Sequence, residues 1–392
     1  MLNNLNQNFS LSTFFKKIFK NKKLELHEPT FNLKELLAIK SCVKNKDVSS
    51  AGSLTLVFEK LIAKTVNCKF VIATNSGTSA LHLALLSLGV KRGDEVLMPS
   101  LNYIASANAC LYIGAIPHFV DIDNKTLSVD VIKLNTYLKK NSVIKNGICI
   151  NKKTKKKISS IICLHPFGHP CEINKILNVS RKFKLSVIED AAEALGSYYK
   201  KKHLGTFGDV GILSFNGNKI ITTGGGGAVL TNNPNIAKKV FQLSTNFKKK
   251  HFCNYEYDNL GYNYRMPSLN SALGIVQIKK LNYFVDKKRK LYKIYEKMFN
   301  GNIYFKLLKE PVNSKSNYWL QTIILNEDNI KLRNKIINSS HKDGIKIRPV
   351  WRPIHKSKHL KHCPKMDLKN TNSLENRILN LPSGPDLLEL LK

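Results

Sequence analysis

Short apolar runs alternate with amphipathic stretches over most of the 392-residue chain. Apolar runs, several of them rich in β-branched and aromatic residues, predict strands at residues 70–73, 96–99, 118–121, 160–164 and 185–188. Residues 79–88 and 106–113 carry apolar side chains at helical spacing and separate the first three of these strands. Strands that alternate with helices in this way predict an α/β fold, with a mostly parallel central sheet covered by helices on both faces.

The pattern changes towards both ends of the chain. Residues 1–24 combine several asparagines with a short basic and aromatic patch at 14–20. This composition predicts a loose N-terminal extension, and a helix that lies on a membrane surface is the alternative. After residue 275 a Lys-rich helical stretch leads into strand-like segments. We therefore expect a large domain over residues 25–275 and a smaller C-terminal α+β domain over residues 276–392.

The net charge of +36 comes from 63 basic and 27 acidic residues. Only eight of the basic residues are arginine, so 55 are lysine. Base reading and bidentate phosphate contacts favour arginine, and the chain has no nucleic-acid recognition motif, so we expect no nucleic-acid partner. A non-enzymatic protein that binds polyanions through its charge stays open as an alternative.

The eight cysteines form no C-x-x-C pair and no zinc-type cluster with histidine, so we expect reduced thiols and no metal site. No apolar run reaches the length of a membrane span, and the first residues lack the basic-then-apolar order of a signal peptide. These features predict a cytoplasmic protein without stable membrane insertion.

Candidate chemistry is concentrated between residues 186 and 231. Asp190 follows a predicted strand, and the carboxyl end of a parallel strand is where α/β proteins bind ligands, although a helix N-cap is an equal alternative. Lys219 stands alone among small residues, whereas most lysines of the chain lie in clusters; a solvated loop lysine is the alternative. The glycines at 224–227 form neither a dinucleotide-binding nor a P-loop motif.

An acid, an isolated lysine and a small-residue turn that opens a helix fit one cofactor, pyridoxal 5'-phosphate. Its aldehyde needs a lysine, here Lys219, and its pyridinium nitrogen needs a carboxylate, here Asp190. Its phosphate needs backbone N–H groups at a helix N-terminus, which Gly77 and Thr78 would offer.

The chain also resembles a known family, the DegT/StrS family of nucleotide-sugar aminotransferases. The resemblance lies in residues 75–82 (NSGTSALH), 93–96 (GDEV), 189–193 (EDAAE), 205–209 (GTFGD), 214–219 (SFNGNK) and 261–266 (GYNYRM). It extends over all but the first two dozen residues. It implies the fold type I of pyridoxal-phosphate-dependent aminotransferases, with a large domain around a mostly parallel sheet and a smaller C-terminal domain.

The resemblance also implies roles for individual residues. Lys219 would bind the cofactor and move the proton between cofactor and sugar, and Asp190 would hold the pyridine nitrogen protonated. Glu193 takes a position, often glutamine in the family, that approaches the 3-oxygen of the cofactor; it is either protonated there or contacts the substrate instead. Tyr103 would stack on the pyridine ring, and Asn102 departs from the threonine usual in the family.

The remaining implied contacts belong to the phosphate, the partner subunit and the substrate. Gly77, Thr78 and Ser214 would bind the phosphate, and Asn263 would reach the phosphate of a neighbouring subunit, which implies a homodimer with shared active sites. The candidate substrate residues are Ser50, His169 and Arg348.

The implied activity is transfer of an amino group from an amino acid, with glutamate expected as donor, to C4 of a nucleotide-linked 4-keto-6-deoxy sugar. The product would enter a surface polysaccharide such as lipopolysaccharide. Residues 163–170 (CLHPFGHP) and 219–227 (KIITTGGGG) resemble the branch that makes legionaminic-acid or bacillosamine-type sugars, with perosamine synthases nearby. A sugar dehydratase of the same fold is the alternative, but those enzymes replace the lysine by histidine, and Lys219 argues against it.

Overall fold

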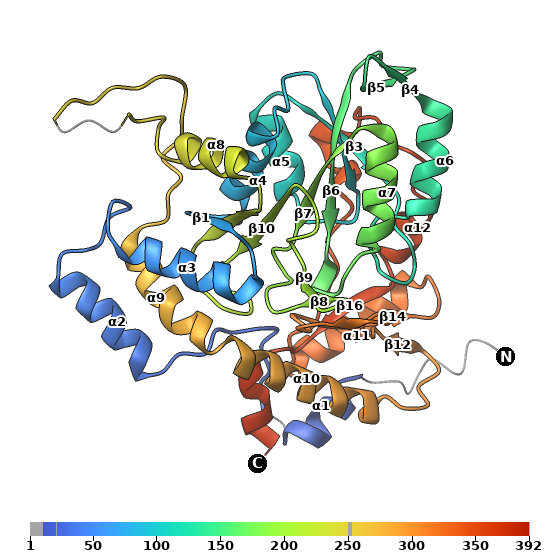
Figure 1. Ribbon diagram of the computed structural model, residues 1–392. Helices are drawn as coiled ribbons and strands as arrows, with labels where there is room; N and C mark the ends of the chain where they lie inside the picture. Colours follow the sequence, from blue (N-terminus) through green and yellow to red (C-terminus); the bar gives the residue numbers. More distant parts are fainter. Residues whose placement is uncertain (1–10, 21, 250–252, 392) are drawn as a thin grey trace.

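A seven-stranded sheet lies at the centre of the larger part of the molecule (Figure 1), in the order β1-β11-β10-β7-β6-β2-β3. The computed structural model describes residues 11–20, 22–249 and 253–391. The strands of this sheet are β1 (Phe70–Thr74), β2 (Glu95–Pro99), β3 (Ile116–Val120), β6 (Ile158–Leu164), β7 (Ser186–Asp190), β10 (Val210–Ser214) and β11 (Gly227–Thr231). All neighbours from β10 to β3 pair in parallel, whereas β11 is antiparallel to both β1 and β10. The expected mostly parallel sheet is confirmed.

Helices cover both faces of this sheet. They are α3 (Leu54–Val66), α4 (Gly77–Ser87), α5 (Ala105–Tyr112), α6 (Val131–Asn141), α7 (Ile173–Phe183), α8 (Pro234–Ser244) and α9 (Ser268–Lys279). Side chains alternate along the edge strand β1: Ile72 packs with the cluster that includes α4 and α5, whereas Val71 and Ala73 pack with Phe58 of α3. This period of two is the reason that a strand buried on both faces reads as a continuous apolar run.

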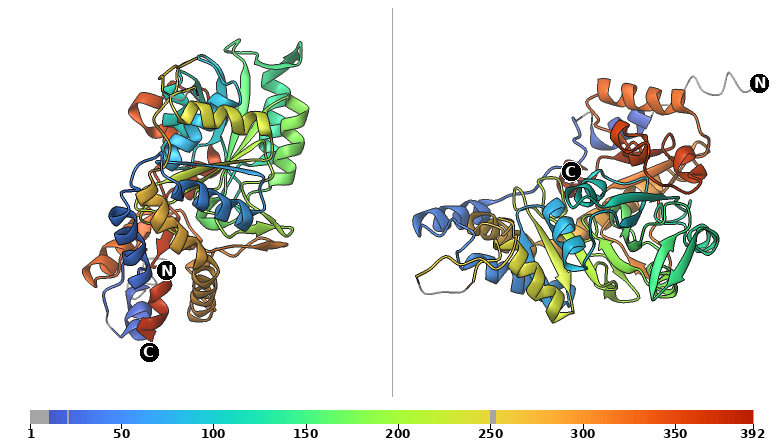
Figure 2. Two further views of the ribbon diagram at one scale, coloured as in Figure 1. Left: turned by 60° about the vertical axis from the view of Figure 1, so that its left-hand side comes forward. Right: turned by 90° about the horizontal axis from the view of Figure 1, so that it is seen from above.

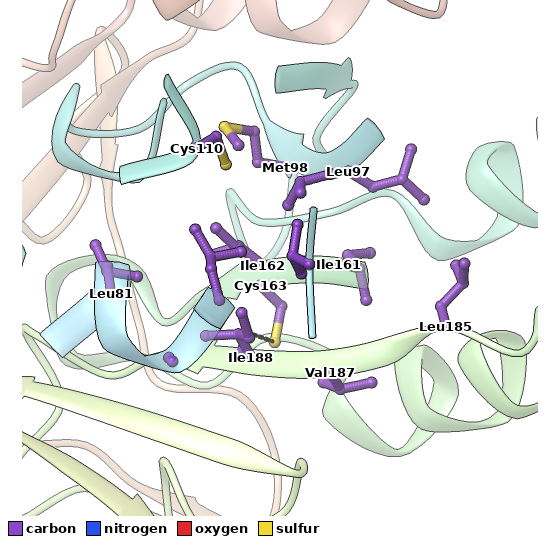
Figure 3. Packing of buried hydrophobic residues seen from close by; sticks show 14 of the residues in the cluster. Leu81, Leu97, Met98, Cys110, Ile161, Ile162, Cys163, Leu185, Val187 and Ile188 are labelled. Atoms are coloured by element: carbon purple, nitrogen blue, oxygen red, sulfur yellow. Dashed lines mark hydrogen bonds between the residues drawn. The ribbon is translucent and has the colours of Figure 1, made fainter. Parts of the chain in front are cut away.

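Figure 3 shows part of the larger of the two clusters. Leu81 of α4 and Cys110 of α5 lie among the apolar side chains of three neighbouring parallel strands. These side chains are Leu97, Met98, Ile161, Ile162, Cys163, Val187 and Ile188. The packing fixes the carboxyl end of β7, where Asp190 lies.

The second part of the molecule is built on a four-stranded antiparallel sheet in the order β12-β14-β16-β15. Its elements are α10 (Leu281–Met298), β12 (Phe305–Leu307), β14 (Gln321–Leu325), α11 (Ile330–Lys342), β15 (Arg348–Pro349), α12 (Lys369–Leu374) and β16 (Ile378–Leu381). Helix α10 joins the two parts: Phe284 packs in the core of the large sheet, and Leu291 and Tyr295 pack in the core of the small one.

The N-terminal segment differs from the expected loose extension. Helix α1 (Leu11–Phe19) lies beside α11 and the C-terminal 3-10 helix Pro385–Leu391 (Figures 1 and 2). Its side chains Leu11, Phe15 and Phe19 are fully buried, and the ring of Phe15 packs edge-on against Tyr295 at 5.5 Å. The apolar face that would have suited a membrane surface is thus covered by protein. Leu11, Phe15 and Phe19 are four residues apart, which is a helical pattern. Tyr295, against which Phe15 packs, lies 280 residues further along the chain. Residues 1–10 of the expected extension lie outside the described residues.

The remaining elements are peripheral. They are α2 (Leu33–Lys44), the hairpin of β4 (Ser142–Lys145) and β5 (Ile148–Asn151), and the small sheet of β8 (Tyr198–Tyr199), β9 (Lys202–His203) and β13 (Ser314–Lys315). Three further 3-10 turns cover Pro166–Gly168, Ile354–Lys356 and Lys358–Leu360. Within the described ranges, no helix has both the length and the apolar character needed to span a membrane.

Candidate active site

A cavity of about 410 Å³ lies at the carboxyl ends of the parallel strands, where the small sheet and its loops face the large one. Most of the expected site residues line it, and they come from five separate segments of the chain. These residues are Gly77, Thr78, Tyr103, Asp190, Glu193, Ser214, Lys219 and Arg348. The fold thereby brings together groups separated by up to 271 positions in sequence.

Asp190 is the last residue of β7, and its side chain is buried. Its Oδ2 accepts a hydrogen bond from Ser106 Oγ at 3.2 Å, and its Oδ1 accepts from the backbone N–H of Ala192 at 3.2 Å. Burial raises the pKa of Asp190, and the Ala192 N–H and the charge of Lys219 act against that rise. The result is a held, desolvated carboxyl group at the edge of the sheet, able to pair with a cationic ring nitrogen. Residues 191–197 form turns and no helix, so the contact of Asp190 with the Ala192 N–H closes a turn and is not the helix N-cap considered from the sequence.

Lys219 lies in the loop after β10, and its side chain is only 13% exposed. Its Nζ is 3.6 Å from Glu193 Oε1 and 3.9 Å from the centre of the Trp319 ring. Burial lowers the pKa of Lys219, while Glu193 and Asp190 raise it by smaller amounts. An ammonium group that loses its proton more easily than a surface lysine is suited to nucleophilic and proton-transfer chemistry.

Glu193 faces Lys219 from the opposite wall of the cavity. Its Oε2 accepts a hydrogen bond from the backbone N–H of Phe167 at 2.7 Å. Burial raises the pKa of Glu193 to about 7, although the charge of Lys219 lowers it. Glu193 therefore exchanges its proton near neutral pH, which is consistent with the protonated form considered from the sequence.

The end of the cavity formed by β1, α4 and β10 is shaped for a phosphate. Ser76 is the N-cap of α4, and its Oγ accepts from the backbone N–H of Ser79 at 3.0 Å. Gly77 and Thr78 form the first turn of this helix, where backbone N–H groups have no partner within the helix. A Cβ atom on Gly77 would lie 3.0 Å from Cβ of Ser214, so glycine permits this close approach of helix and strand.

Asn102 and Tyr103 follow β2 on another wall. Asn102 Nδ2 donates to Ser106 Oγ at 3.0 Å, and Ser106 in turn donates to Asp190. Asn102, which stands where the family usually has threonine, thus orients Ser106, and Ser106 in turn bonds Asp190. Tyr103 lines the cavity and is 58% exposed, so its ring is available to cover a ligand.

Three expected site residues do not line the cavity. Ser50 is half-buried in the loop before α3, and Asn263 is exposed. His169 is buried, its Nδ1 lies 3.0 Å from Ser316 Oγ, and burial lowers its pKa to about 4. The ring of Tyr318 packs edge-on against it, so His169 lies among protein side chains outside the cavity.

Two functional groups were not found from the sequence. Trp319 stacks on Lys219, and its indole N–H donates to the backbone oxygen of Asn218 at 2.7 Å, so it holds the loop that carries the lysine. Ser106 orients Asp190. Both act through residues that are distant in sequence, and neither belongs to a local motif that could have indicated it.

The residues present fit pyridoxal phosphate. A buried carboxyl group, a lysine amine with a side chain only 13% exposed, and a helix N-terminus whose first residue is a glycine lie around one cavity. They match the ring nitrogen, the aldehyde and the phosphate of this cofactor in charge and in hydrogen-bonding character. The fold and this donor set define a pyridoxal-phosphate-dependent aminotransferase of fold type I.

Comparison with known proteins agrees with this assignment. The family model described as the DegT/DnrJ/EryC1/StrS aminotransferase family matches residues 30–389, and the chain belongs to that family. It is 36% identical over 376 residues to a GDP-perosamine synthase of Escherichia coli O157:H7, covering 93% of this chain and 94% of the relative. It is 33% identical to a UDP-4-amino-4,6-dideoxy-N-acetyl-beta-L-altrosamine transaminase of Campylobacter jejuni, covering 87% of each.

Solved structures give the same architecture. The Helicobacter pylori aminotransferase PseC, involved in the biosynthesis of pseudoaminic acid, superposes with a TM-score of 0.84 at 25% identity. The match covers 94% of this chain and 97% of that one. The enzyme class and the cofactor expected from the sequence are confirmed.

Proposed function

We propose that the protein transfers an amino group from an amino acid, with glutamate as the expected donor, to C4 of a nucleotide-linked 4-keto-6-deoxy sugar. The observation that carries the proposal is the pairing of Lys219 with Asp190 and the α4 N-terminus around one cavity. The relatives named as sugar aminotransferases support the sugar as acceptor. The product would serve surface-polysaccharide synthesis, including lipopolysaccharide, and the enzyme would act in the cytoplasm.

Each cavity residue has a part in this activity. Pyridoxal phosphate, when bound, supplies an electron-withdrawing ring that stabilises negative charge on the reacting carbon. Asp190 keeps a positive charge on the ring nitrogen by ion pairing, and the first turn of α4 holds the phosphate. Lys219, whose pKa is lowered by burial, accepts a proton at Nζ from the donor carbon and returns one to the sugar carbon.

Glu193 and Arg348 complete the site. Glu193 holds or releases a proton near neutral pH at Oε1, 3.6 Å from Lys219 Nζ. Arg348 is exposed at the small-domain wall of the cavity, where a guanidinium suits the diphosphate of a sugar nucleotide. Trp351 lines the same wall and stacks on Phe167 with ring centres 5.3 Å apart.

The test is a panel of 4-keto-6-deoxy sugars on UDP, GDP and dTDP, each with glutamate and pyridoxal phosphate, followed by mass analysis of the products. We expect one sugar nucleotide to gain an amino group in place of the keto oxygen, with 2-oxoglutarate formed in equal amount. The Lys219→Ala variant is the matched control. Loss of water from the sugar without amination would favour the dehydratase alternative, and no product from any acceptor would exclude both.

We further propose a homodimer with shared active sites. Asn263 lies outside the cavity of its own chain and is exposed, as expected of a residue that reaches a partner's phosphate. Helix α2 also presents Leu33, Leu36 and Leu37 to solvent, each more than half exposed, and an apolar face of this kind suits an interface between subunits.

A mixing experiment tests the shared sites. Lys219→Ala and Asn263→Ala proteins, each weakly active alone, should regain activity when they are unfolded and refolded together, because one site of each mixed dimer is intact. Light scattering gives the oligomeric state independently. A monomer, or mixed protein no more active than the sum of its components, would contradict the proposal.

A further inference from the structure

The hairpin of β4 and β5, with the residues on either side of it, is the most basic segment of the described chain. We define this basic hairpin segment as residues 139–157. It contains eight lysines in 19 residues and no aspartate, glutamate or arginine, against 55 lysines in 392 residues overall. A general excess of lysine in the composition does not explain threefold local enrichment together with the absence of acids.

These lysines are free to act together. Seven of the eight are exposed; they are Lys139, Lys140, Lys145, Lys152, Lys153, Lys155 and Lys156. Among the described residues, only Lys157 has a carboxylate within ion-pair distance, Asp94 at 3.6 Å. The other nearby acid, Glu95, is buried and bonded to His118 and Asn151. The local charge is therefore largely uncompensated.

Apolar side chains stand among the lysines at the tip of the hairpin. Val143, Ile144 and Ile148 are 37%, 40% and 41% exposed. They flank the turn Asn146–Gly147, in which both residues have positive φ. Exposed isoleucines beside a cluster of lysines combine the two contacts that hold a protein on an anionic membrane: apolar insertion at the interface and attraction to charged head groups.

The position of the hairpin suits such a contact. It leads directly into the amino end of β6, whereas the cavity lies at the carboxyl ends of the strands. Figure 1 shows it projecting at the upper edge of the molecule, whereas the small sheet lies in the lower part. Lys156 and His362 line one hollow, so segment 358–365 with three further lysines extends the basic surface. A membrane bound here would leave the cavity open to soluble substrates.

We propose that this basic hairpin segment docks the enzyme peripherally on an anionic lipid surface. A nucleic acid fits less well, because the segment has no arginine and carries apolar side chains at its tip. A second copy of the chain meeting the same face would oppose lysine to lysine.

Vesicle co-sedimentation of the full-length enzyme tests this proposal. Vesicles of phosphatidylcholine and phosphatidylglycerol in equal parts should bind the enzyme, and pure phosphatidylcholine should not. Combined Lys145→Gln, Lys153→Gln and Lys155→Gln changes should weaken binding about 100-fold, because each lysine near the surface contributes about fivefold. Combined Ile144→Thr and Ile148→Thr changes should weaken binding while leaving the charge intact. Neither set touches the cavity, so transaminase activity should persist and report correct folding.

The matched control removes the same charge elsewhere. Lys331, Lys342 and Lys346 are exposed in or just after α11 on the small domain, and their change to glutamine should have little effect on binding. The proposal is overturned if wild-type enzyme does not bind the anionic vesicles at about 0.1 M salt. It is also overturned if the control set weakens binding as much as the hairpin set, or if a DNA duplex displaces the vesicles at equal phosphate concentration.

Discussion

Two lysines of this chain, one largely and one fully removed from solvent, stand in different surroundings, and the difference separates a catalytic role from a structural one. Lys219 lines the cavity, 3.6 Å from a carboxyl group and 3.9 Å from an indole ring. Lys288 on α10 is fully buried, and its Nζ donates to the backbone oxygens of Trp319 at 3.0 Å and Ser383 at 2.5 Å. Burial lowers the pKa of both. A lowered pKa alone therefore does not identify the catalytic lysine; an open cavity and an acid partner do.

The largest expected effect is loss of Lys219. Lys219→Ala should lower transaminase turnover by at least about 10³-fold, because among the described residues no other lysine lines the cavity to move the proton. The visible absorption band of lysine-bound pyridoxal phosphate should disappear with it. The comparison of the two lysines fails if the variant keeps this band, or if Lys288→Met loses it as well.

Removal of the Asp190 charge should have the next largest effect. Asp190→Asn keeps the shape and the contact with Ala192 but not the negative charge, and turnover should fall by roughly 10²-fold. Ser106→Ala removes only the hydrogen bond at 3.2 Å and should cost far less. Single-turnover kinetics with glutamate measure the loss of turnover in each variant. Equal losses in the two variants would mean that orientation, and not charge, is the contribution of Asp190.

The residues of this site differ in how well sequence could predict them. Lys219, Asp190 and the turn at Gly77 could be predicted because each has a local signal: an isolated lysine, an acid after a strand and small residues before a helix. Trp319 could not be predicted, since it reaches Lys219 only through the packing of the small sheet against the large one. His169 is a different case: it lies in a family-like turn, but its side chain faces Ser316 within the protein and does not line the cavity.

The fold shows the same division. The parallel sheet follows from alternating apolar runs and helices, which are local patterns. The burial of α1 does not, because it depends on Tyr295 of a helix at the other end of the sequence. The segment itself is amphipathic, but that local pattern does not show which part of the protein its apolar face packs against.

A smaller effect, on stability, is expected at Lys288. Lys288→Met keeps the length of the side chain but leaves the backbone oxygens of Trp319 and Ser383 without this donor. The free energy of unfolding should fall by about 1–3 kcal/mol, as for buried polar groups left unsatisfied. Urea unfolding followed by circular dichroism measures this change. Turnover per folded molecule should stay near the wild-type value, and a loss comparable to that of Lys219→Ala would break the distinction between the two lysines.

The finest test concerns Glu193, the acid partner of Lys219; among the described residues Lys288 has no carboxylate within ion-pair distance. Burial raises the pKa of Glu193 from 4.5 to about 7 in the folded protein. Between these values the folded state binds a proton that the unfolded state has released, so this group's contribution to stability is greatest at low pH. The contribution is lost as pH rises towards 7 and is constant above that.

Glu193→Gln lacks this titration, so its stability relative to wild type should rise with pH across the interval and then level off. Urea unfolding of both proteins at a series of pH values measures the difference, with Glu327→Gln as an exposed control. If the difference in the free energy of unfolding does not vary with pH, Glu193 is ionised over this whole interval. Lys219 then faces a carboxylate instead of a carboxyl group that titrates near neutral pH.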